Sequence, residues 1–137
     1  MSLVQLFYVS RARVTVDNEA VKAILAASRR NNYRDDITGC LLFSGRFFAQ
    51  VLEGRADVTE RKLELIGLDS RHTDFRLLLE RQVLVRAYPD WTMGYLHDQD
   101  LEDELEALLR STEVEPESIV DIMDRMKPDS VMGALGS

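Results

Sequence analysis

The chain has 137 residues, of which 45% are hydrophobic and 30% are charged, and its formal net charge is −7. This composition is typical of one soluble globular domain, and the lone cysteine, Cys40, excludes an internal disulfide and a cysteine-based metal cage. Because no apolar run approaches the ~20 residues of a membrane span and the first residues do not predict a signal peptide, we expect a cytoplasmic protein that does not bind a membrane.

The N-terminal part of the chain predicts a strand followed by a helix. β-Forming residues alternate over residues 3–10, so Tyr8 shares one face with the other even-numbered side chains of that strand. Asp17 is a good N-cap for a helix whose apolar residues follow at helical spacing. We expect Asn31 and Asn32 to end this helix.

A hairpin and a second helix are expected next. The segments "ITGCLLF" (37–43) and "RFFAQVLE" (46–53) flank a Ser-Gly pair, which is a hairpin signal. Gln50 lies in the middle of the second strand, where a buried amide needs hydrogen-bond partners. Asp57 with a glutamate three residues later is a capping-box arrangement and predicts a helix over residues 57–68.

Two further strands complete the sheet. A strand is expected within residues 75–85, before the break at Pro89 and Asp90, and residues 91–96 predict a short last strand. The order β-α-β-β-α-β-β predicts an α+β fold in which two helices cover one face of a mixed sheet.

The C-terminal tail differs from the rest of the chain in charge. Residues 1–94 hold 14 Lys and Arg against 12 Asp and Glu, whereas residues 95–137 hold 3 against 12. We therefore divide the chain into a domain at residues 1–96 and a helical extension at residues 97–137. A solvated helical face is the simplest explanation of the acidic charge, which disfavours nucleic acid as a partner. The extension predicts two helices, with apolar stripes at Leu101, Leu105, Leu108 and Leu109 and at Ile119, Val120, Met123 and Met126.

The sequence offers little for catalysis. It has neither a Walker A loop nor a GxGxxG pattern. His72 and His97 are the only histidines and are not at metal-ligand spacing, so we expect no metal site. No Ser-His-Asp or Cys-His arrangement has a recognisable context, and we expect no enzyme activity.

Several polar residues point instead toward the expected core. Tyr8 and Gln50 lie on apolar strand faces, and the apolar stripe of the first helix turns polar at Ser28, Asn31 and Asn32. If both helices cover this face, the polar groups converge in one pocket that suits a planar heterocycle with amide-like edges. Each group also has a plain structural alternative: the asparagines as helix C-caps, Tyr8 as a core edge, and Gln50 as a partner of Tyr8 or of backbone.

Five segments together indicate a family. They are "YVSRA" (8–12), "SRRNN" (28–32), "DITGCLLFSGRFFAQVLEG" (36–54), "LDSRH" (68–72) and "DWTMG" (90–94). In this order and spacing they resemble the BLUF family of flavin-using blue-light sensors, and the resemblance covers residues 1 to about 96. It implies a ferredoxin-like fold with a flavin between the two helices, in a short, stand-alone sensor.

The resemblance also implies roles for individual residues. Tyr8 would be the photoactive tyrosine and Gln50 the essential glutamine, while Trp91 and Met93 would relay the signal. After blue-light excitation, an electron and a proton would leave Tyr8, and the Gln50 amide would rotate or tautomerise, which leaves a red-shifted spectrum. The residues expected around the flavin are Tyr8, Ile24, Ser28, Asn31, Asn32, Gln50, Ile66, Asp69, Arg71 and His72.

The expected cofactor is non-covalent FAD, with FMN or riboflavin as alternatives. The expected partners are an unidentified downstream protein with a basic surface and a second copy of the chain, since the outer sheet face and the tail helices are hydrophobic. Two other functions stay open: a small flavin-using oxidoreductase of ferredoxin-like fold, which NADPH would bleach, and a cofactor-free interaction module, which would be colourless.

Overall fold

One five-stranded sheet organises the protein, as a computed structural model shows for residues 2–13 and 16–127. The strand order is β4-β1-β3-β2-β5, and neighbouring strands are antiparallel except β2 and β5, which are parallel. This confirms the expected α+β, ferredoxin-like sheet. The elements are β1 (Leu3–Ala12), α1 (Asn18–Asp35), β2 (Thr38–Phe43), β3 (Phe47–Arg55), α2 (Ala56–Gly67), β4 (His72–Val83), β5 (Gly94–His97), the 3₁₀ helix η1 (Gln99–Leu101), α3 (Glu102–Arg110) and α4 (Pro116–Met126).

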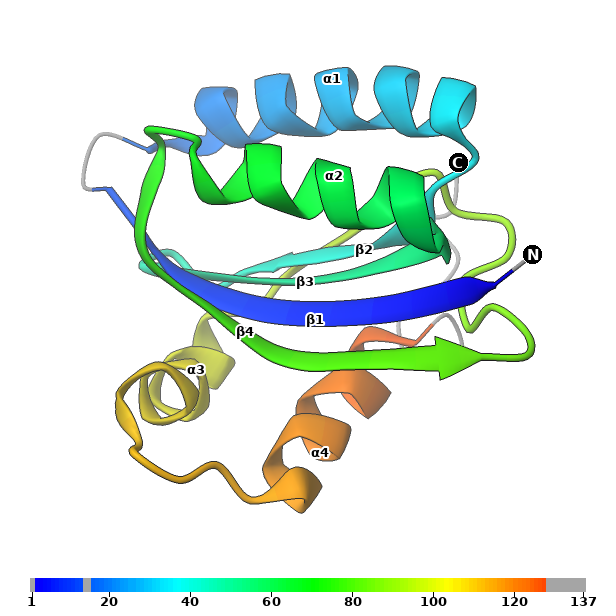
Figure 1. The fold of residues 1–137 in the computed structure, drawn as a ribbon. Helices are drawn as coiled ribbons and strands as arrows, with labels where there is room; N and C mark the ends of the chain where they lie inside the picture. The colour runs from blue at the N-terminus through cyan, green and yellow to red at the C-terminus, as the bar shows by residue number, and fades with distance from the viewer. Residues whose placement is uncertain (1, 14–15, 128–137) are drawn as a thin grey trace.

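Helices cover both faces of the sheet. The pair α1 and α2 lies over one face, and α3 and α4 lie over the other (Figure 1). The central strands therefore need apolar side chains in both directions, and every residue of β2 is buried. No helix within residues 2–13 and 16–127 is both long and apolar enough to cross a membrane.

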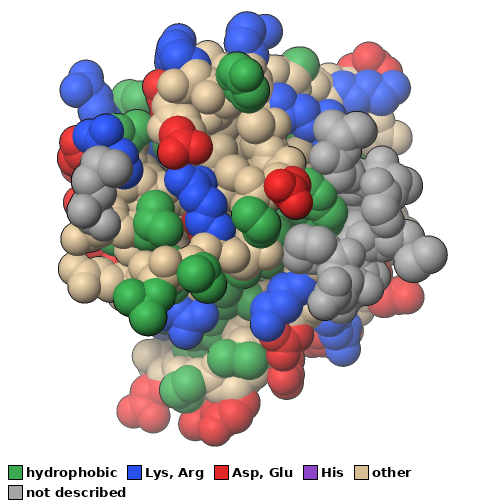
Figure 2. Space-filling view, turned by 90° about the vertical axis from the view of Figure 1, so that its right-hand side faces the viewer, with side chains coloured by type: hydrophobic (Ala, Val, Ile, Leu, Met, Phe, Trp, Pro, Cys, Tyr) green, Lys and Arg blue, Asp and Glu red, His purple; other side chains and the backbone are tan. Residues whose placement is uncertain are grey.

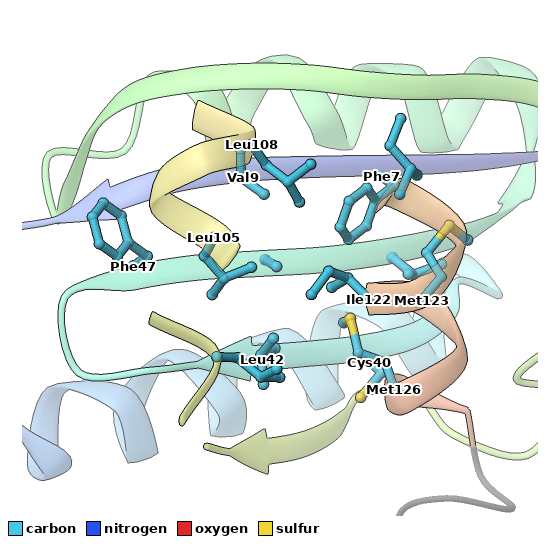
Figure 3. Packing of buried hydrophobic residues seen from close by; sticks show 14 of the residues in the cluster. Phe7, Val9, Cys40, Leu42, Phe47, Leu105, Leu108, Ile122, Met123 and Met126 are labelled. Carbon is cyan, nitrogen blue, oxygen red and sulfur yellow. The ribbon is translucent and has the colours of Figure 1, made fainter. Parts of the chain in front are cut away.

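Two hydrophobic clusters fill the spaces between the sheet and its helices. The cluster below α1 and α2 includes Leu6, Ile37, Leu52 and Met93. The other cluster joins β1, β2 and β3 to the tail helices; it contains Phe7, Val9, Cys40, Leu42, Phe47, Leu105, Leu108, Ile122, Met123 and Met126 (Figure 3). Each large side chain that is fully buried contributes about 1.5–3 kcal/mol, so α3 and α4 are firmly packed on the sheet.

The tail helices bury their apolar stripes as the spacing predicts, with one exception. Leu101, Leu105 and Leu108 of the first stripe are buried, and Leu109 packs at the edge of the same cluster. In the second stripe, the prediction for Val120 is wrong, because its side chain is exposed. Ile122 is buried in its place. Ile119, Ile122 and Met126 follow the i, i+3, i+7 rule of a helix face, which Val120 does not share.

The first helix begins where expected but ends later. The Asp17 side chain accepts a hydrogen bond from the Ala20 backbone N–H over 2.9 Å, which confirms the predicted N-cap. The expected end at Asn31 and Asn32 is wrong, because α1 continues to Asp35. It ends at Asp36, which adopts the left-handed conformation (φ 56°) that allows its N–H to reach the carbonyls of the last turn.

The predicted capping box of the second helix does not form. Helix α2 begins at Ala56 after Arg55, and its N-cap position has no side-chain hydrogen bond. Asp57 lies inside the first turn, where it accepts from the Val58 N–H and pairs with Arg55. A carboxylate in the first turn still interacts favourably with the helix dipole, so Asp57 marks this helix end without capping it.

The last strand is shorter than predicted. It comprises only Gly94–His97, so Trp91 and Met93 precede β5 and do not belong to it. The backbone of residues 91–93 is irregular and is held by hydrogen bonds to β2 and α1.

Candidate functional site

Tyr8 and Gln50 are direct partners across the central strands. They face each other in the register of β1 and β3, and the Tyr8 hydroxyl donates to Gln50 Oε1 over 2.6 Å. The Gln50 Nε2 group donates to the sulfur of Met93 over 3.2 Å. Both polar side chains are buried, so the amide lies between a phenol and a thioether with its two ends distinguished.

Burial keeps the Tyr8 hydroxyl protonated. Desolvation raises the pKa of Tyr8 far above its ordinary value of about 10, and the negative charge of Asp69 raises it further. The phenol is therefore a neutral hydrogen-bond donor at all ordinary pH values. The hydrogen bond of this hydroxyl is directed at Gln50 Oε1.

Helix α1 contributes Asn32, which has one satisfied and one unsatisfied amide end. Its Nδ2 donates to the Thr92 carbonyl over 2.9 Å. Its Oδ1 is buried and has no hydrogen-bond partner among the described residues. A buried acceptor without a partner costs about 1–3 kcal/mol, so this oxygen indicates a donor supplied by a bound group.

His72 connects β4, β1 and α2 through both ring nitrogens. Its Nδ1 lies 2.6 Å from the Ser10 hydroxyl oxygen, and its Nε2 lies 2.6 Å from the Ile66 carbonyl oxygen. Because a carbonyl can only accept, the neutral ring carries its proton on Nε2 and accepts from Ser10. His72 thus fixes the C-terminal end of α2 over the sheet.

Asp69 and Arg71 form an ion pair at the rim of the same region. The guanidinium of Arg71 donates to both carboxylate oxygens of Asp69, over 2.9 and 2.6 Å. These hydrogen bonds hold the pKa of Asp69 below its usual value and raise that of Arg71. The pair is partly exposed, so solvent screens it and its contribution to stability is small.

A cavity of about 100 Å³ lies between the sheet, α1 and α2 and collects these groups. Nine of the ten residues expected around the flavin line it: Tyr8, Ile24, Ser28, Asn32, Gln50, Ile66, Asp69, Arg71 and His72. The tenth, Asn31, lines a different cavity between the last turns of α1 and the side of α2, together with Arg34, Asp57 and Arg61. Successive helix residues point about 100° apart, which explains why only one of the two asparagines faces the sheet.

Four lining residues were not predicted: Leu41, Phe48, Leu52 and Lys62. Strand alternation offers a signal for two of them, since Phe48 and Leu52 share a face with Gln50. Leu41 stands opposite Gln50 in the β2–β3 register, which the hairpin turn sets. Lys62 carries no such signal, because its position depends on how α2 rotates over the sheet.

Trp91 and Met93 occupy opposite faces of the sheet. Met93 belongs to the cluster below α1 and α2 and contacts Gln50, whereas Trp91 packs in the cluster with α3 and α4. The Trp91 ring lies against the Tyr88 ring, with centroids 6.0 Å apart. Of the two expected relay residues, Met93 is therefore the neighbour of Gln50.

The polar groups of the cavity match those of a flavin ring, but the cavity is smaller than the pockets that usually hold such ligands. A flavin edge alternates carbonyl acceptors with an N–H donor, which matches the unsatisfied Asn32 Oδ1 and the Gln50 amide. The volume of about 100 Å³ is below the roughly 300–1,000 Å³ of ligand pockets, so the walls must move apart on binding. Helix α2 forms one of these walls; Thr59 is its buried residue, and Val58, Leu63 and Ile66 pack against the core as partly buried side chains.

The fold and the site define a ligand-binding domain, with a partly polar cavity under two helices of a ferredoxin-like sheet. Residues 3–94 match the family profile described as "BLUF: Sensors of blue-light using FAD". The chain belongs to the BLUF family, whose members bind flavin and sense blue light. This confirms the resemblance seen in the sequence.

Relatives and solved structures agree with this assignment. The photoactivated adenylate cyclase subunit beta of Euglena longa is 34% identical over 93 residues, which are 67% of this chain and 11% of that protein. The blue light- and temperature-regulated antirepressor BluF of Escherichia coli K12 is 38% identical over 80 residues, 56% of this chain and 19% of that protein. The chain therefore spans a small part of these curated relatives.

Among solved structures, the dark state of the BLUF protein BlrB has a TM-score of 0.77 at 31% identity and covers 90% of this chain and 93% of that one. The photo-activated state of BlsA also has a TM-score of 0.77, at 22% identity over 90% of this chain and 94% of that one, and shows the same fold.

Proposed function

We propose that this protein senses blue light through the hydrogen-bonded series Tyr8, Gln50 and Met93 and passes the signal to another protein. The single observation that carries the proposal is the buried Gln50 amide, which accepts from Tyr8 and donates to Met93. A bound flavin would supply the absorption of blue light and the electron acceptor. Tyr8 would supply one electron and its hydroxyl proton, and both would return to it at the end of the cycle.

The two ends of the Gln50 amide explain how one side chain can hold two states. In the present arrangement the oxygen faces the Tyr8 hydroxyl and the nitrogen faces the Met93 sulfur. Rotation by 180° would turn the nitrogen toward Tyr8 and the oxygen toward sulfur. Oxygen and sulfur are both acceptors there, so the rotated state removes the contact that holds Met93 in place.

The displaced Met93 would carry the change to the tail. Met93 directly precedes β5, and β5 leads through η1 into α3. Helices α3 and α4 pack on the opposite sheet face, in the cluster that also holds Trp91. We propose that light alters this packing and thereby a surface for a downstream protein, without any catalytic activity of this chain. The charge of −9 over residues 95–137 favours a partner with a basic surface.

FAD is the flavin that we propose, with FMN or riboflavin as the alternatives. Arg71 and Lys62 provide cations at the cavity, which suits a flavin that carries phosphate. The cavity residues Asn32 and Gln50 would contact only the ring, which all three flavins share. Liquid chromatography of the flavin released by denaturation distinguishes them.

Self-association is a further proposal, and its basis differs from the sequence expectation. The outer sheet face that suggested it is covered by α3 and α4 of the same chain (Figure 1). Exposed apolar side chains remain at Leu68, Leu84 and Val85. On the face shown in Figure 2, hydrophobic side chains form separate small groups among charged ones. Light scattering coupled to size-exclusion chromatography in the dark and under blue light measures the oligomeric state.

An absorption spectrum of the purified protein before and after blue light tests the proposed function. We expect flavin bands that shift reversibly to longer wavelength, together with release of all flavin on denaturation, since no covalent link is expected. Flavin that NADPH bleaches with turnover would favour the oxidoreductase instead. Protein that stays colourless after incubation with flavin would favour the cofactor-free module.

A further inference from the structure

Trp91 and Met93 lie on opposite sheet faces although they are two residues apart. In an extended strand, residues i and i+2 share a face. Here Met93 lies below α1 and α2, and Trp91 lies among the side chains of α3 and α4. The backbone between them must therefore depart from a strand, and its shape decides which of the two side chains meets Gln50.

Hydrogen bonds fix each carbonyl of this segment. The Trp91 carbonyl accepts from the Gly39 N–H over 3.0 Å, and the Thr92 carbonyl accepts from Asn32 over 2.9 Å. The Met93 carbonyl accepts from Arg29 Nε over 2.9 Å. These bonds hold the segment from the side of β2 and α1. They leave open what holds Trp91 on the far side of the sheet.

Glu53 supplies an anchor on that far side. Its side chain is fully buried, and its carboxylate accepts from the backbone N–H groups of Ala87 and Tyr88, each over 2.9 Å, and from Gln5 Nε2 over 2.8 Å. Its described hydrogen-bond donors are thus uncharged. A buried carboxylate without a cationic partner is costly, so these hydrogen bonds define the position of residues 87–88 closely.

Tyr88 passes this constraint to Trp91. Its ring is buried, its hydroxyl donates to the Met123 carbonyl of α4, and it packs against the Trp91 ring. Gly94 forms the other side of the Trp91 site, where a Cβ atom would overlap the indole ring. The Trp91 ring therefore packs against the Tyr88 ring and occupies the space that a side chain at position 94 would fill.

We infer that Glu53 is a positioning residue, which keeps Trp91 on the tail-helix side and so selects Met93 as the neighbour of Gln50. The consequence for light sensing rests on the proposed function. Met93 offers an acceptor to the Gln50 Nε2 group, whereas the indole N–H of Trp91 would offer a donor to Gln50 Oε1. Loss of the Glu53 anchor would bias the dark-state amide toward its rotated orientation and reduce the light-induced spectral shift.

The test uses the flavin-loaded full chain in the dark, with Trp91 as the reporter because it is the only tryptophan. NMR of the indole N–H should show one environment with nuclear Overhauser contacts to Tyr88. In Glu53→Gln an NH₂ group replaces one acceptor oxygen, so we expect the indole signal to shift, its contacts to Tyr88 to weaken and contacts to Gln50 to appear. Gly94→Ala displaces the same ring without altering Glu53 and should give the same result.

Two control variants separate positioning from general stability. Glu102→Gln is the same chemical change at a partly exposed carboxylate that contacts Ser44, and Tyr88→Phe keeps the ring and removes its hydroxyl. Both should leave the Trp91–Gln50 contact absent and the light-induced shift at its wild-type size. Glu53→Gln and Gly94→Ala should each reduce that shift.

The outcomes are separable. If folded Glu53→Gln retains the wild-type contacts of Trp91, Glu53 contributes only stability and the inference is overturned. Should Glu53→Gln fail to fold, Gly94→Ala decides: a displaced indole with an unchanged light-induced shift also overturns it. A wild-type protein without any light response would contradict the proposed function, while the NMR contacts would still report whether Glu53 positions Trp91.

Discussion

Gln50 lies directly opposite Tyr8 in the antiparallel pair of β1 and β3, and its Oε1 accepts a hydrogen bond from the Tyr8 hydroxyl over 2.6 Å. Both side chains are buried, so water does not compete for this hydrogen bond and the low local dielectric strengthens it. The neighbouring strands set the distance between the two side chains. The proposed photochemistry thus depends on a pair that the rigid centre of the sheet positions.

Replacement of Tyr8 by phenylalanine should preserve flavin binding and abolish the normal light response. The ring keeps its packing against Phe75, whereas the hydroxyl that donates a hydrogen bond to Gln50 is lost. Gln50 Oε1 then lacks its donor, and we expect a loss of about 1–3 kcal/mol in the free energy of unfolding. Absorption spectra and urea denaturation measure both effects. A wild-type red shift in this variant would contradict the role of Tyr8; Tyr88→Phe, on the opposite sheet face, is the control.

Asn32→Ala should weaken flavin binding about tenfold, whereas Asn31→Ala should leave it unchanged. Asn32 Oδ1 is the buried acceptor without a partner, and one hydrogen bond to a ligand of about 1.4 kcal/mol corresponds to that factor. Asn31 lines a separate cavity and serves as the matched control. Titration of the apoprotein with flavin, followed by fluorescence, measures both affinities. Equal losses in the two variants would show that the asparagines act only through the helix.

Light should change hydrogen exchange along the path from Met93 to the tail helices. The contact of Met93 with Gln50 is the first step of this path, and α3 and α4 share a cluster with Trp91. We expect faster exchange in the light within residues 91–126. Mass spectrometry of the two states gives the measurement. If these residues are equally protected in light and dark while another region changes, the relay lies elsewhere.

Alkaline pH should destabilise the protein, and less so after Tyr8→Phe. Burial raises the pKa of Tyr8 in the folded state, so the unfolded chain loses this proton first as the pH rises. The stabilising contribution is complete below about pH 10 and decreases above it, by up to about 1.4 kcal/mol per pH unit. Urea denaturation at pH 8 and pH 11 measures the slope. Tyr88, whose pKa burial also raises, should behave similarly; an unchanged slope in Tyr8→Phe would refute the assignment.

The sequence predicts those features that depend on local pattern. Alternation places Tyr8 and Gln50 on the correct faces, and helical spacing identifies the buried leucines of α3. These patterns hold because side-chain direction in a regular element follows from the backbone alone. The direct pairing of Tyr8 with Gln50 also depends on the register of β1 and β3, which residue alternation alone does not determine.

The features that were missed depend on tertiary contacts. Helix α1 continues past Asn32 because that side chain finds a partner at Thr92, far along the chain, instead of capping its own helix. Trp91 and Met93 lie on opposite faces because the backbone between them is irregular, and hydrogen bonds from Arg29 and Asn32, which no periodic pattern describes, hold that backbone. Lys62 reaches the cavity through the rotation of α2 over the sheet.

The most direct test of the account is the light-minus-dark absorption spectrum of Gln50→Leu beside that of the wild type. Leucine keeps a comparable volume among Phe48 and Leu52 and removes both ends of the amide, so the hydrogen bonds to Tyr8 and Met93 are lost together. We expect the variant to bind flavin and to show no red shift under blue light, while the wild type shows a reversible one. A flavin-loaded Gln50→Leu protein with the wild-type red shift would contradict the account.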